Sequence, residues 1–333
     1  MKDIRAYSLK QHNTFGIDVT CSRYLEYSTQ EEARQVARIL RESNQPHLVI
    51  GSGSNLLLTR DFEGIVVRSV LRGMTIDGER LTCGSGMTWD DVVDYSIAHD
   101  LHGAENLSLI PGDVGACAVQ NIGAYGVEAK DLIARVWAIE IATGEERVFR
   151  CDECKYGYRQ SRFKREWQGR YLITQVEFAL NREFRPRLDY GNIRSELARR
   201  GIDKPTARQL RDTIISIRRE KLPDPAVLGN GGSFFMNPVV ERAVYERLAH
   251  DYPAMPHYPV DADHEKIPAG WLIEQCGWKG RAMGRAAVYE KQALVLVNLG
   301  GASGADILAL CLAVQHDVKA RFGISIQPEV HIV

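Results

Sequence analysis

The chain has 333 residues, 44% hydrophobic and 26% charged, which is typical of a globular protein and excludes a disordered or fibrous one. Its 42 Lys and Arg residues balance 43 Asp and Glu residues, so no global charge draws it to nucleic acid or to an anionic membrane. The seven scattered cysteines indicate reduced thiols rather than a disulfide framework. Neither a signal peptide nor a run of about eighteen apolar residues is present, so we expect a cytoplasmic protein.

The first region, residues 1–70, is predicted to be a small α+β unit. Apolar residues recur at helical spacing between Ser28 and Ser43, behind a Ser/Thr cap. The run HLVI at 47–50 follows as a short buried strand, and a second strand is expected at 65–68.

The second region, residues 71–220, begins with a helix whose apolar side carries Trp89, Val92, Val93 and Ile97. A long loop dotted with glycines is expected at 102–126. The later predicted elements are an antiparallel hairpin at 135–141 and 148–150, a strand at 171–180 and a helix at 206–220.

The third region, residues 221–325, begins where two prolines in KLPDP (221–225) interrupt the chain. A strand is predicted at 293–299. The next predicted element is a helix at 306–322 that turns Ile307, Cys311, Leu312, Val314 and Val318 to the core. Residues 326–333 are expected to form an extended C-terminal segment.

Two glycine-rich segments could bind a ligand. GSGSN at 51–55 follows a buried strand and would let backbone N–H groups approach a phosphate, although a simple glycine turn explains it equally well. It is not a Rossmann fingerprint, because the sixth residue is Leu56 and no long helix follows. IPGDVGACAVQNIGAYG at 110–126 is too long for a hairpin turn, which is typical of a functional loop or of a buried structural one.

Seven motifs occur together in a fixed order along nearly the whole chain. They are GSGSNLL at 51–57, IPGDVGACAVQNIGAYG at 110–126, YRQSRFK at 158–164, KLPDP at 221–225, GNGGSFFMNP at 229–238, AGWLIE at 269–274 and QPEV at 327–330. In this combination the sequence resembles the UDP-N-acetylenolpyruvoylglucosamine reductase family, in its longer type with an inserted tyrosine loop.

The resemblance implies an α+β fold with an FAD-binding domain of the vanillyl-alcohol-oxidase type in two subdomains and a C-terminal substrate-binding domain. The implied reaction is NADPH-dependent reduction of UDP-N-acetylglucosamine enolpyruvate to UDP-N-acetylmuramate, through FAD, in peptidoglycan precursor synthesis. By motif position, the cofactor-binding residues would be Gly51, Ser52, Gly53, Ser54, Asn55, Pro111, Gly112, Val114, Gly115, Asn121, Ala124, Gly126 and Ile173.

The resemblance further implies three catalytic residues. Arg159 would stabilise the negative charge that grows on the enolpyruvyl group, Ser233 would deliver a proton, and Glu329 would orient a water or polarise the reacting carbon. Without the resemblance, Arg159 is a solvated member of a basic run, Ser233 a turn serine and Glu329 a surface carboxylate.

Substrate binding is carried over to Tyr190, Lys221, Asn237, Tyr258 and Gln292. Two residues depart from the family pattern. Met236 stands where a lysine is usual, which removes a cation beside the substrate. Asp113 would repel the cofactor diphosphate if it pointed inward, so we expect it to face away.

Other interpretations receive less support. Cys151 and Cys154 form CDEC, but no second cysteine pair or histidine pair completes a metal site, so none is expected. The basic and aromatic run at 155–167 is typical of an RNA surface, yet the balanced charge disfavours one. A different oxidase or dehydrogenase on the same flavin scaffold, or a nucleotide-binding module, is the alternative. We expect a monomer that binds NADPH and a UDP sugar, with no nucleic-acid or membrane partner.

Overall fold

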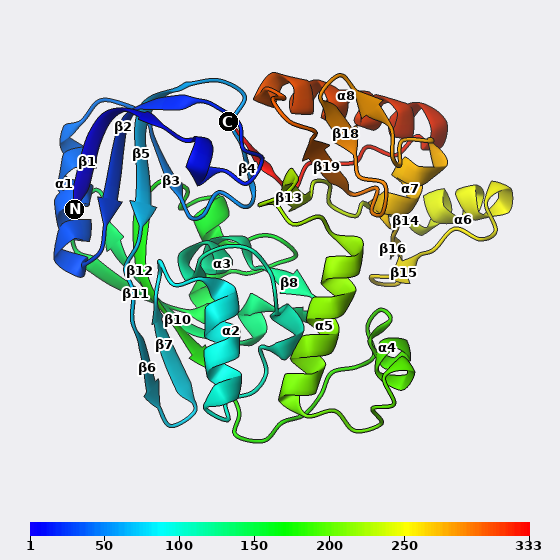
Figure 1. Cartoon of the computed structure of the whole chain (residues 1–333), viewed down its shortest axis with the longest axis horizontal. Helices are drawn as coiled ribbons and strands as arrows, with labels where there is room; N and C mark the ends of the chain where they lie inside the picture. Colours follow the sequence, from blue (N-terminus) through cyan, green and yellow to red (C-terminus); the bar gives the residue numbers. More distant parts are fainter. The chain divides into compact units, whose positions relative to one another are not determined.

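The computed structural model describes residues 1–333, which form two compact units (Figure 1). Unit 1 comprises Met1–Tyr7, Thr20–Ser52 and Phe62–Glu220, and unit 2 comprises Ser8–Val19, Gly53–Asp61 and Lys221–Val333. Both mix helices and strands, which confirms the predicted α+β class. No helix of the chain has the length and apolar character needed to cross a bilayer.

Unit 1 contains a four-stranded sheet in the order β1-β2-β5-β3, in which β2, β5 and β3 run parallel. Helix α1 (Gln30–Glu42) begins where the Thr29 side chain accepts a hydrogen bond from the Glu32 N–H. Its apolar side packs in one core cluster with residues of β2 and β5. The strands are β1 (Lys2–Ser8), β2 (Thr20–Tyr27), β3 (His47–Ile50) and β5 (Phe62–Ser69).

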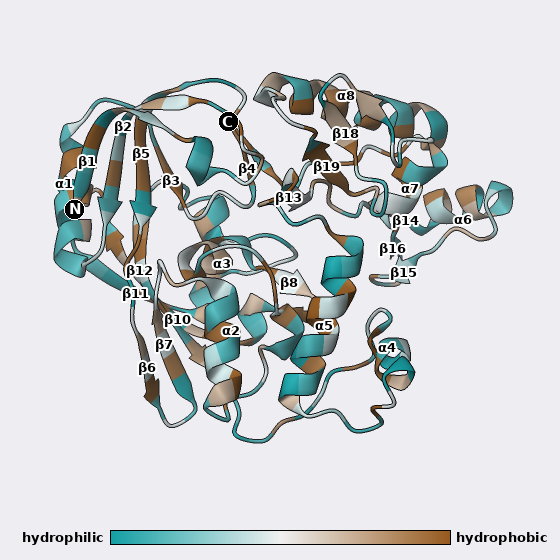
Figure 2. Cartoon of the chain, in the orientation of Figure 1, coloured by the Kyte–Doolittle hydropathy of each residue, from teal (hydrophilic) through white to brown (hydrophobic).

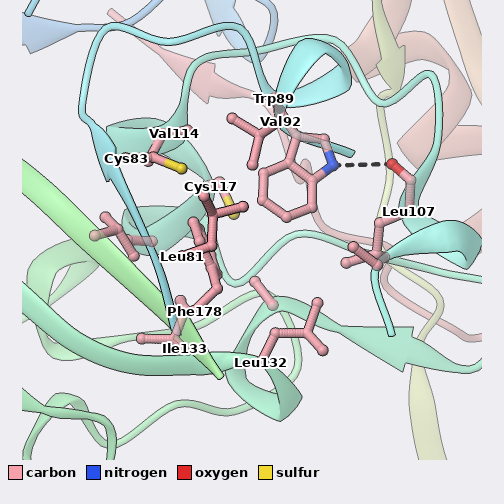
Figure 3. Close-up of a cluster of buried hydrophobic side chains, with 14 of the residues drawn as sticks. Leu81, Cys83, Trp89, Val92, Leu107, Val114, Cys117, Leu132, Ile133 and Phe178 are labelled. Atoms are coloured by element: carbon pink, nitrogen blue, oxygen red, sulfur yellow. Dashed lines mark hydrogen bonds between the residues drawn. The ribbon is translucent and has the colours of Figure 1, made fainter. Parts of the chain in front are cut away.

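A second, antiparallel sheet of unit 1 has the order β11-β10-β12-β7-β6. Trp89, at the start of α2 (Trp89–Ala98), lies at the centre of its core, edge-on to Phe178 (Figure 3). The indole N–H donates to the Leu107 carbonyl at 2.9 Å, so the one polar atom of the ring is satisfied (Figure 3). The strands are β6 (Met74–Asp77), β7 (Arg80–Gly84), β10 (Ile133–Glu140), β11 (Glu146–Arg150) and β12 (Tyr171–Ala179).

Shorter elements and the remaining helices complete unit 1. Helix α3 (Val114–Gln120) ends at Asn121, which has a left-handed backbone with φ +47°. The others are the 3₁₀ turns η2 (Glu105–Leu107), η3 (Ala129–Asp131), η4 (Cys151–Cys154) and η5 (Arg162–Lys164), the strands β8 (Gly123–Ala124) and β9 (Val127–Glu128), and the helices α4 (Ile193–Arg199) and α5 (Ala207–Lys221).

Unit 2 has its own core around the sheet β13-β19-β18-β17 and helix α8 (Gly304–Phe322). Strands β18 and β19 are largely brown in Figure 2, whereas the surface helix α1 of unit 1 is largely teal. Ser303 and Asp306 form a capping box that starts α8, and Gly323 ends it with φ +71°. The four strands are β13 (Gly229–Ser233), β17 (Ala282–Met283), β18 (Ala286–Val288) and β19 (Val295–Asn298).

Two smaller sheets belong to unit 2. One has the order β14-β16-β15, and in the other β20 pairs in parallel with β4. Their strands are β4 (Leu56–Leu57), β14 (Val239–Glu241), β15 (Tyr258–Pro259), β16 (His264–Lys266) and β20 (His331–Ile332). The turn η1 (Lys10–His12) and the helices α6 (Arg242–Asp251) and α7 (Ala269–Gln275) complete the unit.

Two structural predictions were wrong. The expected loop at 102–126 contains α3, whose Val114, Cys117 and Ala118 are buried at helical spacing. The sequence gives no clear signal for this helix, because it is short and its buried face consists of small apolar residues between glycines. Packing against the rest of the protein determines its conformation. Leu312 of α8 is 56% exposed, because it lies beside the buried stripe of Cys311 and Val314 rather than on it.

Candidate functional site

The glycine loop after β3 offers a tight backbone cradle in unit 1. A Cβ at Gly51 would lie 3.1 Å from the Ala116 Cβ and 3.3 Å from an Asp113 carboxylate oxygen, so a larger residue would crowd these side chains. The hydroxyl of Ser52 is buried and has no hydrogen-bond partner in the protein. Because a buried hydroxyl without a partner is costly, a ligand oxygen at this position would satisfy it. Gly51 and Ser52 therefore fit the phosphate of a cofactor such as FAD.

The second half of the loop belongs to unit 2 and contacts the C-terminal segment. Gly53 has φ +73°, and a Cβ there would lie 2.0 Å from the His12 carbonyl oxygen, so no other residue fits. The Asn55 side chain donates to the Glu329 carbonyl at 3.2 Å, and the His331 N–H donates to the Asn55 carbonyl at 3.1 Å. The structure thus brings together Ser54–Asn55 and Glu329, which lie far apart in the sequence.

The expectation that Asp113 faces away from the glycine loop was wrong. Its Oδ2 would lie 3.3 Å from a Cβ at Gly51 and is buried without a hydrogen-bond partner, with a guanidinium nitrogen of Arg68 3.8 Å away. Burial raises the pKa of Asp113, and the charges of Arg68 and Arg72 act in the opposite direction. The charge of Arg68 offsets part of the cost of burying this carboxylate. Arg68 belongs to no motif of the sequence, so its position beside Asp113 could not be predicted.

The 110–126 segment is organised largely by Asn121. Its side-chain N–H groups donate to Glu128 at 2.9 Å and to the Gly157 carbonyl at 2.8 Å, while its side-chain oxygen accepts from the Lys130 N–H at 2.9 Å. These three hydrogen bonds of the Asn121 side chain are made within the protein, and they fix the conformation at the end of α3.

The other predicted cofactor residues of this segment differ in exposure. Pro111 is exposed, Val114 is buried in the core, and Gly112 has φ +135°. Gly115 packs against Ser85 and donates to its carbonyl at 2.9 Å.

Arg159 is held against this same segment by an unusual backbone. Gly157 and Gln160 exchange two hydrogen bonds of 3.0 Å, which closes a tight turn in which Arg159 has φ +55°. This left-handed conformation costs a non-glycine residue roughly 1–2 kcal/mol. The guanidinium donates to the Gly123 carbonyl at 2.7 Å and to the Asn121 carbonyl at 3.4 Å. The turn and these carbonyls fix the position of the charge.

Two more predicted residues of unit 1 lie in different environments. Tyr190 is 51% exposed and packs on Gly126, where a Cβ would lie 3.5 Å from the Tyr190 Cβ. Ile173 is buried on β12, and its carbonyl accepts a hydrogen bond from the Tyr27 hydroxyl at 2.8 Å. Ala124, in β8, lies between Gly123 and Gly126 on the segment that Arg159 contacts.

In unit 2 the segment after β13 pairs with the C-terminal segment. The Glu329 N–H donates to the Phe234 carbonyl at 2.7 Å, and the Met236 N–H donates to the Gln327 carbonyl at 2.9 Å. Gly232 has φ +70°, which only glycine adopts without strain, just before Ser233. The pairing places Ser233 and Glu329 on adjacent backbone segments.

The predicted substrate residues of unit 2 fall into two groups. Asn237 accepts a hydrogen bond from the Ala269 N–H at 2.9 Å, and the Gln292 side-chain oxygen would lie 3.2 Å from a Cβ at Gly270, so both lie at the start of α7. Tyr258 is 51% exposed on β15. Lys221 is exposed at the end of α5.

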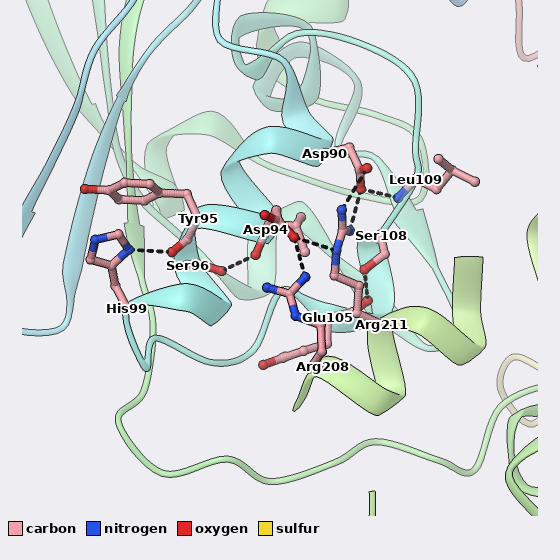
Figure 4. A network of polar contacts seen from close by, with 11 residues as sticks. Asp90, Asp94, Tyr95, Ser96, His99, Glu105, Ser108, Leu109, Arg208 and Arg211 are labelled. Atoms are coloured by element: carbon pink, nitrogen blue, oxygen red, sulfur yellow. Dashed lines mark hydrogen bonds and ion pairs between the residues drawn. The ribbon is translucent and has the colours of Figure 1, made fainter. Parts of the chain in front are cut away.

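A partly buried ion pair fixes α5 within unit 1 (Figure 4). Two guanidinium nitrogens of Arg211 donate to the two carboxylate oxygens of Asp90 at 2.6 and 3.0 Å, and the Leu109 N–H donates to the same carboxylate at 2.5 Å. Asp94 accepts from the Arg211 Nε at 3.2 Å. Because Leu109 directly precedes the 110–126 segment, this pair connects that segment with α2 and α5.

Comparisons with known proteins identify the family of the chain. Residues 22–152 match the FAD binding domain, and residues 224–333 match the C-terminal domain of UDP-N-acetylenolpyruvoylglucosamine reductase. A reductase of this name from Bacteroides fragilis is 53% identical, covering 98% of this chain and 99% of its own. One from Burkholderia multivorans is 45% identical, covering 97% and 95%. The crystal structure of the Thermus caldophilus reductase shares the fold, with a TM-score of 0.69, 23% identity and coverage of 99% and 98%.

Proposed function

The chain belongs to the UDP-N-acetylenolpyruvoylglucosamine reductase family of FAD oxidoreductases, and we propose that NADPH is the hydride donor for its reaction. The reaction of this family reduces the enolpyruvyl group of a UDP sugar during synthesis of the peptidoglycan precursor. The proposed product is UDP-N-acetylmuramate. The observation that carries the proposal is the presence, in one chain, of the glycine cradle at Gly51–Ser52 and the paired segments that carry Ser233 and Glu329.

The cofactor would be held mainly by backbone groups. Bound FAD supplies hydride transfer between the nucleotide donor and the substrate. Gly51 and Ser52 would meet its diphosphate with an N–H-rich backbone and a buried hydroxyl. Further binding residues are proposed to be Gly53, Ser54, Asn55, Pro111, Gly112, Val114, Gly115, Asn121, Ala124, Gly126 and Ile173.

Arg159 would stabilise the charge that grows on the substrate. When hydride adds to one carbon of the enolpyruvyl double bond, negative charge develops on the neighbouring carbon and spreads into its carboxylate. A guanidinium that is fixed before the reaction stabilises this charge with little reorganisation. The hydrogen bonds from Arg159 to Gly123 and Asn121 provide this fixation.

Ser233 would deliver the proton that completes the reduction, and Glu329 would assist it. A serine hydroxyl is a weak acid, so transfer depends on the basic carbon that forms and on a hydrogen-bonded neighbour that replaces the proton. The backbone pairing beside Phe234 supports Glu329, or a water it orients, as that neighbour.

The UDP sugar would be bound by Tyr190, Lys221, Asn237, Tyr258 and Gln292. Lys221 and Tyr258 are exposed donors suited to the UDP diphosphate, and Tyr190 offers a ring for stacking. Met236 supplies no charge in this neighbourhood, so anion binding would rest on the remaining donors.

The test is an anaerobic visible spectrum of the purified holoenzyme. Addition of NADPH should bleach the flavin band, and the enolpyruvyl UDP sugar should then restore it. Bleaching without recovery would contradict the proposed acceptor, and failure of NADPH but success of another donor would contradict the proposed donor. Absence of a flavin band even after addition of FAD would refute the entire proposal.

A further inference from the structure

Asp113 directly precedes helix α3 but does not cap it. An aspartate at this position commonly accepts hydrogen bonds from the first N–H groups of a helix. The extended backbone of Asp113, with φ −104° and ψ 157°, suits that role, yet its side chain makes no such hydrogen bond. The carboxylate therefore does not help to start α3, and its position requires another explanation.

The carboxylate lies beside the glycine loop that follows β3. A Cβ at Gly51 would lie 3.3 Å from Oδ2 of Asp113, and Asp113 is only 5% exposed. The backbone on its C-terminal side is fixed by two hydrogen bonds of 2.9 Å, from the Val114 N–H to the Met87 carbonyl and from the Cys117 N–H to the Asp113 carbonyl. This backbone holds the carboxylate next to the loop.

Two buried oxygen atoms at this place lack a hydrogen-bond partner within the protein. One is Oδ2 of Asp113, and the other is the hydroxyl of Ser52, the residue after Gly51. A guanidinium nitrogen of Arg68 lies 3.8 Å from Oδ2, which offsets part of the charge but is too far for a hydrogen bond. Burial also raises the pKa of Asp113, because desolvation disfavours the charged form. Since a buried acceptor in this state is unfavourable, a ligand that donates to Oδ2 would be bound favourably.

The two oxygen atoms require different groups on the same ligand. A carboxylate oxygen only accepts hydrogen bonds, so Oδ2 of Asp113 requires a donor, whereas the Ser52 hydroxyl can donate to a phosphate oxygen. The diphosphate of FAD carries no hydroxyl and on its own would only repel the carboxylate. A hydroxyl a few bonds away from a phosphate ester supplies the missing donor, and this combination is the chemistry of a sugar phosphate.

We propose that the Asp113 carboxylate binds FAD by accepting a hydrogen bond from the sugar hydroxyl next to the diphosphate. This inference rests on the proposed function, in which Gly51 and Ser52 hold that diphosphate, and it adds Asp113 to the binding residues. FAD has two such hydroxyls, the ribityl 4′-hydroxyl on the flavin side and the ribose 3′-hydroxyl on the adenosine side. Because hydrogen bonds to an ionised acceptor are stronger than neutral ones, this contact contributes to cofactor affinity.

The experiment compares FAD binding by the wild-type holoenzyme and by the Asp113→Ala variant. Dilution of each holoenzyme releases flavin, and the fluorescence of the free flavin gives the Kd. Asp113→Ala should raise the Kd about tenfold or more, because a hydrogen bond to a charged group is lost. Asp91→Ala is the control, since Asp91 is an exposed aspartate in the first turn of α2, and it should leave the Kd unchanged. An unchanged or lower Kd in Asp113→Ala would overturn the proposal.

Two analogues of FAD, one without the ribityl 4′-hydroxyl and one without the ribose 3′-hydroxyl, identify the donor. Where the analogue lacks the hydroxyl that Asp113 binds, Asp113→Ala should bind it at least as tightly as the wild type does. The other analogue should retain the difference of about tenfold. Loss of the difference with one analogue supports the proposal and identifies the hydroxyl. A difference that persists with both analogues would show a structural effect and overturn the proposal.

Asp113→Asn provides the same test should the alanine variant fail to fold. It keeps an oxygen acceptor in a side chain of the same shape but loses the charge, so a smaller rise in the Kd is expected, and no rise would overturn the proposal. Failure of the proposed function has a different signature. Neither NADPH nor the UDP sugar takes part in these titrations, so a wrong hydride donor or acceptor leaves the Asp113 result intact. A wild-type protein that does not bind FAD would release no flavin at all.

Discussion

Replacement of Asp90 by alanine should loosen unit 1 at the junction of α2, α5 and the 110–126 segment. The change leaves the Arg211 side chain, only 8% exposed, with Asp94 as its remaining carboxylate. The Leu109 N–H also loses its acceptor. Removal of one partner of a fully buried ion pair costs about 3–5 kcal/mol. Because Asp90 is 24% exposed and Arg211 keeps its contact with Asp94, we expect a cost at or somewhat below the lower end of that range.

Asp94→Ala is the matched control. Asp94 is 49% exposed and also pairs with Arg208, so its removal should cost only about 0–1 kcal/mol. Amide hydrogen exchange of peptides from α2 and α5 measures the local opening free energy directly, without the assumption that the two units unfold together. An Asp90→Ala effect no larger than that of Asp94→Ala would refute the reasoning.

The same pair predicts the direction of the acid response. Burial alone would raise the pKa of Asp90, but the hydrogen bonds from Arg211 and the Leu109 N–H, with the Arg211 charge, hold it below its ordinary value. A carboxylate with a lowered folded pKa contributes stability above its unfolded pKa of about 3.9, and this contribution is lost as the pH falls through the folded value. Exchange protection of α5 should therefore weaken below about pH 4 in the wild type and much less in Asp90→Ala.

Three further variants test the proposed site. Ser233→Ala should leave reduction of the flavin by NADPH nearly intact while slowing reoxidation by the UDP sugar at least ~100-fold, and equal losses in both half-reactions would contradict the proton-donor role. Lys221→Ala should raise the KM for the UDP sugar with little change in kcat; unchanged KM values for both substrates would count against the assignment. Gly53→Ala should impair folding or FAD binding because its Cβ would lie 2.0 Å from a backbone oxygen. Gly16→Ala, which also has positive φ but nothing within 4 Å, is its control, and equal effects of the two on thermal stability and FAD affinity would show that the steric argument fails.

Elements with strong periodicity could be predicted from the sequence. The helix expected between Ser28 and Ser43 is α1, the hairpin is β10 and β11, and the strand predicted at 171–180 is β12. Each of them has a clear cap, turn or alternation of its own. Helix α3 lacks such a signal, since its short apolar stretch becomes helical only through packing against the rest of unit 1.

The same distinction applies to the candidate site, where some residues belong to local motifs and others are brought together only by the fold. The motifs predicted roles for the glycine loop and for Arg159 because glycines and ordered motifs are local features of the sequence, and these roles stay predictions. The inward position of Asp113 was not predictable, since it depends on Arg68, a residue of β5 with no motif of its own. The pairing of Asp90 with Arg211 joins residues 121 positions apart, and no local pattern indicates it.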